Sequence, residues 1–417
     1  MRTSLIVGIL LLVTGVPARP AMAVQDASLM LTADEAVRLY LGRNLGIEAA
    51  RLEVERAAAD RIGARLRPNP ELSVTAENFN LGGPVPFDRI YELGISYSET
   101  IELGGKRRLR SAAADLAVES AEAELADTLR RGVAQVERLY WETVFAQDRV
   151  RIAAEVRDSF QRLLDYSQVR FDAGAIAEAD LIKVRLERVR QDAALRDAEL
   201  DLRHKAIGLA ERIGEREFES RQVNGELVFT PVELDLSTLR SRALESRPDL
   251  RAARLRVEQA GTSIALERSR NSPDLEPFAG YKRVASSNTV IFGIRLPLNF
   301  RDRNPDGIAR ATSQRRIAEA ELGALESRAQ AEVDVAYASY LAAVAQIEIY
   351  QDALIGPSAE VRDIALVSYE EGATDLAPLL EAERALAEVR YGYFETLLDY
   401  QVSLIDLELA VGTEIQQ

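Results

Sequence analysis

The chain has 417 residues, with 52 basic and 67 acidic side chains and a net charge of −15 at neutral pH. This sign argues against nucleic acid as a partner, because proteins bind the phosphate backbone through Lys and Arg. The chain contains no cysteine, which excludes disulfides and thiolate metal sites. Aromatic residues make up only 6%, whereas Ala, Leu, Glu and Arg are abundant, a composition typical of long helices and coiled coils.

Residues 1–23 have the pattern of a secretory signal peptide. Arg2 precedes an apolar core at Leu5–Val13, and Ala21–Ala23 has the small-x-small form of a cleavage site. We expect cleavage near Ala23, which leaves 50 basic and 67 acidic residues and a net charge of −17. Because no cysteine can follow the cleavage site, we expect no lipid anchor at the mature N-terminus.

The sequence contains one turn motif twice, at Phe171–Leu181 and Tyr369–Leu379. Each copy has an aromatic residue, a glycine three positions later, and then small and acidic residues before a leucine. Gly174 and Gly372 are 198 positions apart, and so are Gly214 and Gly412. An isolated glycine within helical periodicity ends or turns a helix, so each motif predicts the turn of a long helical hairpin.

This duplication divides the mature chain into two repeats, 24–214 and 237–412. We expect a connector at 215–236 and a tail at 413–417. The first repeat is predicted to begin with a helix over Thr32–Arg67, capped by Thr32 or Asp34. Its further elements are two strands at about 71–79 and 90–102 and a hairpin over 106–213 with its turn at 172–180.

The second repeat follows the same order. A helix over Leu234–Asn271 matches the first helix. Two strands at about 274–282 and 289–300 and a hairpin over 306–411, with its turn at 371–378, come next. Gly356-Pro357 predicts a kink in the second long helix only. Spacings of three and four residues between Val333, Tyr337, Tyr340, Val344 and Ile347 predict coiled-coil packing.

Each predicted strand alternates apolar and polar residues and has about the length that crosses a bilayer when tilted. Four strands cannot close a barrel, and open sheet edges do not occur in lipid. Further copies must therefore complete the sheet. Three chains give twelve strands, whereas the eight strands of two chains enclose little more than side chains.

This order of elements, duplicated after a signal peptide, resembles the TolC-type outer-membrane efflux channels along nearly the whole mature chain. Glu99–Arg108, which reads ETIELGGKRR, and Leu296–Asn304, which reads LPLNFRDRN, resemble the CzcC-type, heavy-metal (cobalt-zinc-cadmium) branch. The resemblance implies a homotrimer in the outer membrane of a Gram-negative bacterium. A twelve-stranded barrel would continue as a periplasmic coiled-coil tunnel, which meets a periplasmic adaptor and an inner-membrane RND-type, proton-driven pump.

Gly174 and Gly372 are the first candidate functional residues. The resemblance places their turns at the periplasmic mouth, where the adaptor docks. Glycine there also permits close backbone approach. The alternative is that both glycines only reverse the chain.

The acids beside the turns are Glu178 and Asp180 in the first copy and Asp375 and Glu381 in the second. In a trimer each becomes a ring of three carboxylates, which can select cations and gate a pore. The alternative is that they are solvated helix starts. Related channels close their mouth with acidic rings and tyrosine–arginine contacts. We match only Glu381 to the inner ring.

No catalytic, cofactor or metal site is predicted. The mature chain has His204 as its only histidine and Met30 as its only methionine, although soft and borderline metals need such ligands. No nucleophile motif, phosphate loop or HExxH is present. The chain is therefore predicted not to be an enzyme.

The sequence thus favours a passive exit duct of a tripartite efflux system that exports heavy-metal cations. A channel of the same fold for drugs or for type I secretion of polypeptides remains open. A different class is a structural periplasmic coiled coil or adaptor, which would carry a lipoyl-like or β-barrel domain between its hairpin arms. No such domain is visible.

Overall fold

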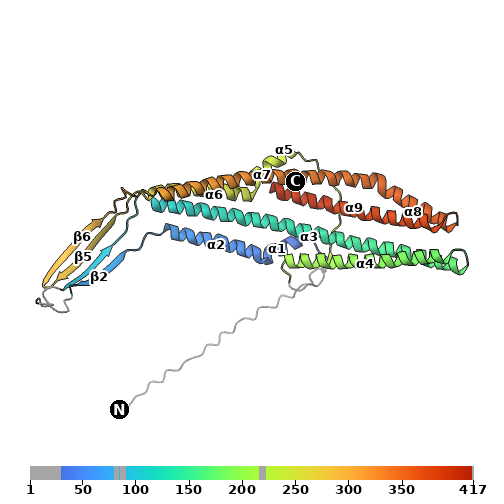
Figure 1. The fold of residues 1–417 in the computed structure, drawn as a ribbon, viewed down its shortest axis with the longest axis horizontal. Helices are drawn as coiled ribbons and strands as arrows, with labels where there is room; N and C mark the ends of the chain where they lie inside the picture. The colour runs from blue at the N-terminus through green and yellow to red at the C-terminus, as the bar shows by residue number, and fades with distance from the viewer. Residues whose placement is uncertain (1–29, 79–83, 85–90, 216–221, 416–417) are drawn as a thin grey trace, which may run out of the picture.

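The molecule is a long rod with a sheet at one end and two helical turns at the other (Figure 1). This computed structural model describes residues 30–78, 84, 91–215 and 222–415. The predicted signal peptide lies outside these residues. In the described part of the chain, no helix is long and apolar enough to cross a membrane.

The first repeat begins with two helices rather than the single helix predicted over Thr32–Arg67. Helix α1 spans Ala33–Arg43 and α2 spans Leu45–Arg65. Thr32 caps α1, and Asn44 stands between the helices. The Asn44 carboxamide oxygen accepts from the N–H of Gly46 at 2.8 Å, which starts α2. This local cap competes with helix continuation and breaks the helix.

The second repeat is interrupted at the equivalent place. Helix α5 spans Leu236–Ser246 and α6 spans Pro248–Ser269, with Arg247 between them in an extended conformation. Pro248 disfavours a helical conformation at Arg247 but suits the first position of α6. The predicted helix over Leu234–Asn271 is therefore also two helices.

Both breaks are held against the end of a hairpin. Asn44 Nδ2 donates to the carbonyl of Arg212 at 3.2 Å, and Arg247 Nη1 donates to that of Ala410 at 3.1 Å. Arg212 and Ala410 are 198 positions apart, the spacing of the duplicated glycines. The two repeats therefore share this contact between the break in the first helix and the end of the hairpin.

Two helical hairpins form most of the rod. The first joins α3, Lys106–Asp172, to α4, Glu178–Arg212. The 67 residues of α3 correspond to about 100 Å at 1.5 Å per residue. The second hairpin contains α7, Pro305–Ile349, a π-helical segment at Tyr350–Leu354, α8, Ile355–Glu370, and α9, Leu376–Val411.

The predicted kink in the second hairpin takes the form of the π-helical segment. Pro357 has no N–H and its ring conflicts with the carbonyl four residues earlier, so the α-helical bonding pattern cannot continue through this point. Widening the preceding turn to a π-helix accommodates the lost bond. Helix α3 is uninterrupted, so the two hairpins differ here.

The four long strands make one antiparallel sheet in the order β2-β3-β5-β6. The strands are β2, Glu71–Glu77; β3, Glu92–Ser98; β5, Glu276–Val284; and β6, Ser287–Arg295. They differ by several residues from the predicted ranges, and residues 79 and 90 lie outside the described part. The β5–β6 turn is only Ala285-Ser286, so β6 begins and ends earlier than expected.

Register explains why one face of the sheet is apolar. Val74 pairs with Ile95, Ile95 with Tyr281, and Tyr281 with Val290. Because side chains alternate along a strand, the residues two positions away continue this face. Most of its large apolar side chains are exposed, among them Phe292 at 83%. On the opposite face, β2 and β3 carry Ser, Thr and Glu residues, whereas β5 and β6 also carry Phe278, Lys282, Val284 and Ile291.

Near the middle of the rod, tyrosine hydroxyls hold the connector between the repeats. Tyr140 donates to the carbonyl of Asn224 at 2.7 Å, and Tyr340 to that of Val232 at 2.8 Å. Strand β4, Gln222–Val223, pairs in parallel with β1, Met30–Leu31. Residues 216–221 of the predicted connector lie outside the described part.

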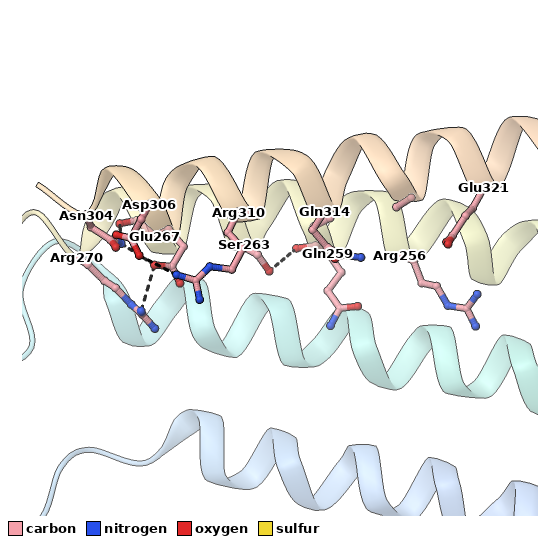
Figure 2. Close-up of a pocket in the computed structure, with 14 residues that line it drawn as sticks. Arg256, Gln259, Ser263, Glu267, Arg270, Asn304, Asp306, Arg310, Gln314 and Glu321 are labelled. Carbon is pink, nitrogen blue, oxygen red and sulfur yellow. Dashed lines mark hydrogen bonds and ion pairs between the residues drawn. The ribbon is translucent and has the colours of Figure 1, made fainter.

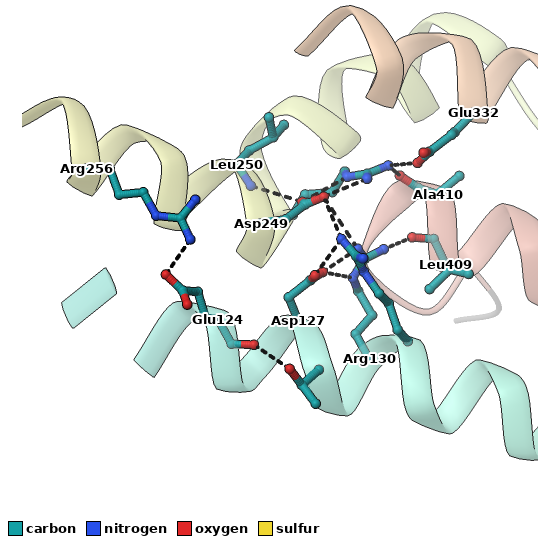
Figure 3. A network of polar contacts seen from close by, with 12 residues as sticks. Glu124, Asp127, Arg130, Asp249, Leu250, Arg256, Glu332, Leu409 and Ala410 are labelled. Carbon is teal, nitrogen blue, oxygen red and sulfur yellow. Dashed lines mark hydrogen bonds and ion pairs between the residues drawn. The ribbon is translucent and has the colours of Figure 1, made fainter. Parts of the chain in front are cut away.

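A buried ionic network lies in the same region (Figure 3). Arg247 is 2% exposed and donates to Asp249 at 2.8 Å and to Glu332 at 2.6 Å. Arg130 approaches Asp249 at 3.7 Å and also bonds to Asp127. The network joins α3, α6 and α7, while the Arg247 bond to Ala410 adds α9. Buried charges of this kind are stable only when fully paired.

Candidate functional site

The turn at Gly174 closes the first hairpin with a Schellman motif. Gly174 has φ +73°, its N–H donates to Phe171 O at 2.8 Å, and the next N–H donates to Arg170 O at 2.8 Å. An added Cβ would meet nothing within 4 Å. Glycine is therefore required here by the left-handed backbone and not by lack of space.

The turn at Gly372 repeats this geometry. Gly372 has φ +74°, and the N–H groups of Gly372 and Ala373 donate to Tyr369 O and Ser368 O at 3.1 and 2.9 Å. The predicted turn at 371–378 ends sooner, because α9 begins at Leu376 and includes Pro378 in its first turn. Proline is well tolerated there, since the first N–H groups of a helix have no internal partner.

The two turns lie side by side at the end of the rod (Figure 1). Arg170 Nη1 donates to the carbonyl of Tyr369 at 2.7 Å, and its guanidinium lies 5.0 Å from the ring centre of Tyr369. It also lies 5.8 Å from the ring centre of Tyr166. Arg170 thus ties the end of α3 to the end of α8, combining a charge-assisted hydrogen bond with cation–π contacts.

Further contacts fix the same junction. The hydroxyls of Ser167 and Tyr369 are 3.4 Å apart and buried, and Tyr166 donates to Glu370 O at 3.2 Å. Apolar side chains of four helices pack behind them. These are Ile152, Val156, Phe160, Leu163, Val184, Tyr369, Leu376, Leu379 and Leu380. The two hairpins therefore meet through a core as well as through Arg170.

The four predicted acids are all at this end of the molecule, but they do not contact one another. Glu178 is exposed in the first turn of α4, and Asp180 pairs with Lys183 at 2.9 Å. Asp375 is the exposed N-cap of α9 without a side-chain bond, and Glu381 is exposed in the next turn. Within the described residues, Glu178, Asp375 and Glu381 have no ion pair.

Sequence reasoning missed the ionic links between the hairpins. Glu187 of α4 is 5% exposed and bonds to Arg384 of α9, with Nε and Oε2 3.3 Å apart. Arg390 of α9 bonds to Glu155 of α3 at 2.6 Å. These residues lie in charged helical stretches where no local pattern marks a long-range partner. Arg170 and Tyr369 had a signal, since both lie within four residues of a turn glycine.

One groove lies away from this end, between α6 and α7 close to the sheet (Figure 2). Its volume is about 640 Å³. Four of its charged side chains are paired locally: Arg310 Nη2 lies 2.8 Å from Asp306 Oδ2, and Arg270 Nη1 lies 3.1 Å from Glu267 Oε2. Across the described ranges, no three His, Cys, Asp or Glu side chains are grouped closely enough to hold a metal ion.

A sequence profile of the outer membrane efflux protein family matches residues 36–215 and 239–413, which is most of the chain and both repeats. The chain belongs to the outer membrane efflux protein family. The predicted family is thereby confirmed, and so are the predicted class of function, an outer-membrane efflux channel, and the expectation that the chain is not an enzyme.

Individual relatives of this efflux protein agree with the assignment. The chain is 27% identical over 377 residues to the cobalt-zinc-cadmium resistance protein CzcC of Cupriavidus metallidurans, covering 89% of this chain and 88% of that protein. The crystal structure of CusC matches with a TM-score of 0.77 at 20% identity, over 91% and 92% of the two chains.

Two further channel structures share the fold. The Campylobacter jejuni CmeC outer membrane channel matches with a TM-score of 0.77 and 18% identity, over 92% of this chain and 87% of that one. The open-state Neisseria gonorrhoeae MtrE outer membrane channel gives 0.75 and 19%, over 92% and 91%. The predicted fold class, mainly helical with four strands per chain, is therefore confirmed.

Proposed function

We propose that three copies of this efflux protein assemble into one passive exit duct across the outer membrane and periplasm. The observation that carries the proposal is the sheet. Its order β2-β3-β5-β6 leaves β2 and β6 as edges, and alternating antiparallel strands make β6 of one copy antiparallel to β2 of the next. Three copies then close twelve strands with the apolar face outward.

The helices support the same closure. Element contacts place α2 and α4 along one edge of the rod and α7 and α8 along the other. Both edges expose large apolar residues, such as Leu52 at 52% and Leu186 at 56% on one, and Val335 at 67% and Ile364 at 59% on the other. When one edge of each copy packs against the other edge of the next copy, the copies form a closed ring if the rotation between neighbours divides a full turn evenly.

In this assembly the hairpin turns form the periplasmic mouth. We assign Gly174 and Gly372 to contacts with a periplasmic adaptor, which links the duct to an inner-membrane RND-type pump. Glu178, Asp180, Asp375 and Glu381 become rings of three carboxylates, since each occurs once per copy. Such rings attract cations and repel anions. Glu178, Asp375 and Glu381 have no ion pair within the described residues of one chain, which supports this assignment.

The proposed cargo is a heavy-metal cation. The similarity to a cobalt-zinc-cadmium resistance protein over nearly the full length supports this substrate class. Among the described residues, no three His, Cys, Asp or Glu side chains are grouped closely enough to hold a metal ion. We therefore assign recognition to the pump and adaptor, while the duct supplies an acidic path. Export of drugs or polypeptides is the second candidate, since the same fold occurs in other outer membrane channels.

Conductance in planar bilayers tests the proposal, using the purified protein and its Glu381→Ala and Asp180→Ala variants. We expect a trimeric, cation-preferring pore of low conductance, and the substitutions should weaken its selectivity or enlarge its conductance. If the protein forms neither a pore nor a trimer, the channel proposal is wrong. If it forms a pore whose conductance and selectivity are unchanged by both substitutions, the channel proposal stands, but the proposed role of the acidic residues is wrong. Zinc and drug tolerance of a deletion strain separates the two cargo classes.

A further inference from the structure

Exposed apolar side chains do not end with β6. Leu296, Leu298 and Phe300 follow the strand, and the N–H of Phe300 donates to Leu298 O at 3.0 Å in a tight turn. They are 44%, 70% and 66% exposed, so they pack against little in their own chain. The exposed apolar surface therefore extends to the loop that enters α7.

Unpaired arginines begin where this apolar surface stops. The Arg301 guanidinium lies 5.9 Å from the ring centre of Phe300, which places it beside the last of these apolar side chains. Similar arginines are found at the other strand–helix junctions of this level. The set, called the basic collar, is Arg67, Arg107, Arg108, Arg268, Arg301 and Arg303. All six are exposed, and within the described residues none has an ion pair with a carboxylate.

Folding of the chain does not explain the collar. Helix α3 starts with Lys106, Arg107 and Arg108 and has no acid in its first turn. Positive charge at the positive end of a helix dipole is unfavourable. Lys106 is compensated by Asp274 at 2.7 Å, but Arg107 and Arg108 are not. These two side chains cost stability unless an anion outside the chain neutralises them.

A second copy is a poor source of that anion. In the proposed trimer the β6–α7 junction, with Arg301 and Arg303, lies beside the β2–α2 junction of the next copy, where Arg67 adds a further cation. The acids near these arginines are already engaged, since Asp302 accepts from the N–H of Asn304 at 2.8 Å and Asp306 pairs with Arg310. The chain as a whole carries a net charge of −15, so the basic collar differs in sign from the rest of the molecule.

We propose that the basic collar binds the anionic phospholipid headgroups of the bilayer leaflet that surrounds the sheet. Exposed apolar residues followed at once by arginines match the order of acyl chains and phosphate groups at a bilayer surface. Arginine also binds phosphate through several donors at once. The proposal rests on the proposed insertion of the sheet into a membrane, and it fixes the depth at which the protein sits there.

Native mass spectrometry of the assembled protein, released from nanodiscs of phosphatidylcholine and phosphatidylglycerol, tests the collar. The variant replaces Arg107, Arg108, Arg301 and Arg303 by Gln. The matched control replaces four exposed arginines on the helices, Arg203, Arg242, Arg251 and Arg328, which also lack an ion pair in the described residues. Native protein and control should retain phosphatidylglycerol over phosphatidylcholine by on the order of tenfold, and the collar variant should lose this preference.

Two further measurements test whether charge is responsible for the lipid preference. Lysine at the same four positions retains the charge and should preserve most of the preference, and high salt should weaken it in the native protein. If native protein that has inserted normally retains both lipids equally, the proposed lipid binding by the basic collar is wrong, but the channel proposal is not affected. Competition by inorganic phosphate as effective as that of the lipid would also overturn it. Failure to enter any bilayer would instead contradict the proposed channel.

Discussion

At the scale of single residues, the two turn glycines can be separated into a folding role and a docking role. Both need a positive φ, yet an added side chain at Gly174 meets nothing within 4 Å. Asparagine tolerates the left-handed conformation, so it tests the surface without breaking the turn.

Gly174→Asn should therefore lower stability by only a few tenths of a kcal/mol. Adaptor binding should weaken about tenfold, equal to about 1.4 kcal/mol, because the added side chain projects into the proposed contact. Calorimetric titration with the purified adaptor measures the change. Gly208→Asn, in an open position within α4, is the control and should bind normally. Unchanged binding by Gly174→Asn would leave the glycine as a turn residue only.

Glu137 on α3 is a residue whose protonation affects folding. Burial, followed by the charges of Glu408, Glu414 and Asp34, raises the pKa of Glu137 from 4.5 to about 7. These carboxylates come from α9, the C-terminal residues and α1. Because the folded state holds the proton more tightly than the unfolded state, stability is highest below pH 4.5 for this group. It falls as the pH rises towards about 7.

Glu137→Gln should abolish this loss and stabilise the protein at pH 8 by about 2 kcal/mol, a value reduced to allow for partial exposure. Thermal unfolding at several pH values between about 4 and 8 measures it. Glu122→Gln on the exposed side of α3 should leave the pH profile unchanged. A profile of Glu137→Gln that parallels the native one would show that this carboxyl is not the titrating group.

At the scale of elements, the helix that changes from α to π packs closely against α9. A Cβ on Gly392 would overlap Tyr350 Oη, and the rings of Tyr350 and Tyr393 lie 6.2 Å apart. Gly323 of α7, by contrast, has open space around it. The two helical glycines thus respond oppositely to the same substitution.

Gly392→Ala should destabilise the protein by roughly 1–3 kcal/mol, since Tyr350 must leave its position. Gly323→Ala should stabilise it by about 0.5–1 kcal/mol, because alanine is the better helix former. Denaturation midpoints of the two variants, compared with the native protein, measure the contrast. Stabilisation by both would mean that the π-helical segment moves away from α9 at no cost.

The same elements mark what the sequence could and could not predict. Hydrophobic periodicity and the paired glycines predicted the long hairpins, because these patterns are local and repeated. The breaks at Asn44 and Arg247 were missed, although Asn and the Arg-Pro step are recognisable cap signals. The strand ends were displaced, since pairing partners on other strands set them. Arg170 and Glu187 were missed because their partners, Tyr369 and Arg384, are about 200 positions away.

At the scale of the whole molecule, the contacts that join the two repeats differ along the length of the rod. The ionic network around Arg247 lies between α5 and α6, near the middle of the rod, and the Arg170 junction lies beside the hairpin turns at its end (Figure 1). Buried and many-membered contacts at the middle make it the rigid part. The turn end has fewer buried apolar side chains than the middle, and the arginines that link the hairpins there, Arg170, Arg384 and Arg390, are half-exposed or exposed, so the second hairpin can separate most easily there.

Arg170→Ala should therefore release the end of α8 from α3 while the rest of the rod stays intact. It removes a hydrogen bond and two cation–π contacts, together about 1–3 kcal/mol, which raises the open fraction of a two-state mouth by about fivefold or more. Single-channel recordings should show larger or more frequent openings. Tyr369→Phe is the matched control, because it keeps the ring and the backbone carbonyl that bind Arg170 and loses only the hydroxyl facing Ser167. Its conductance should stay near that of the native channel. If both variants conduct like the native channel, the junction holds the hairpins together without gating the mouth.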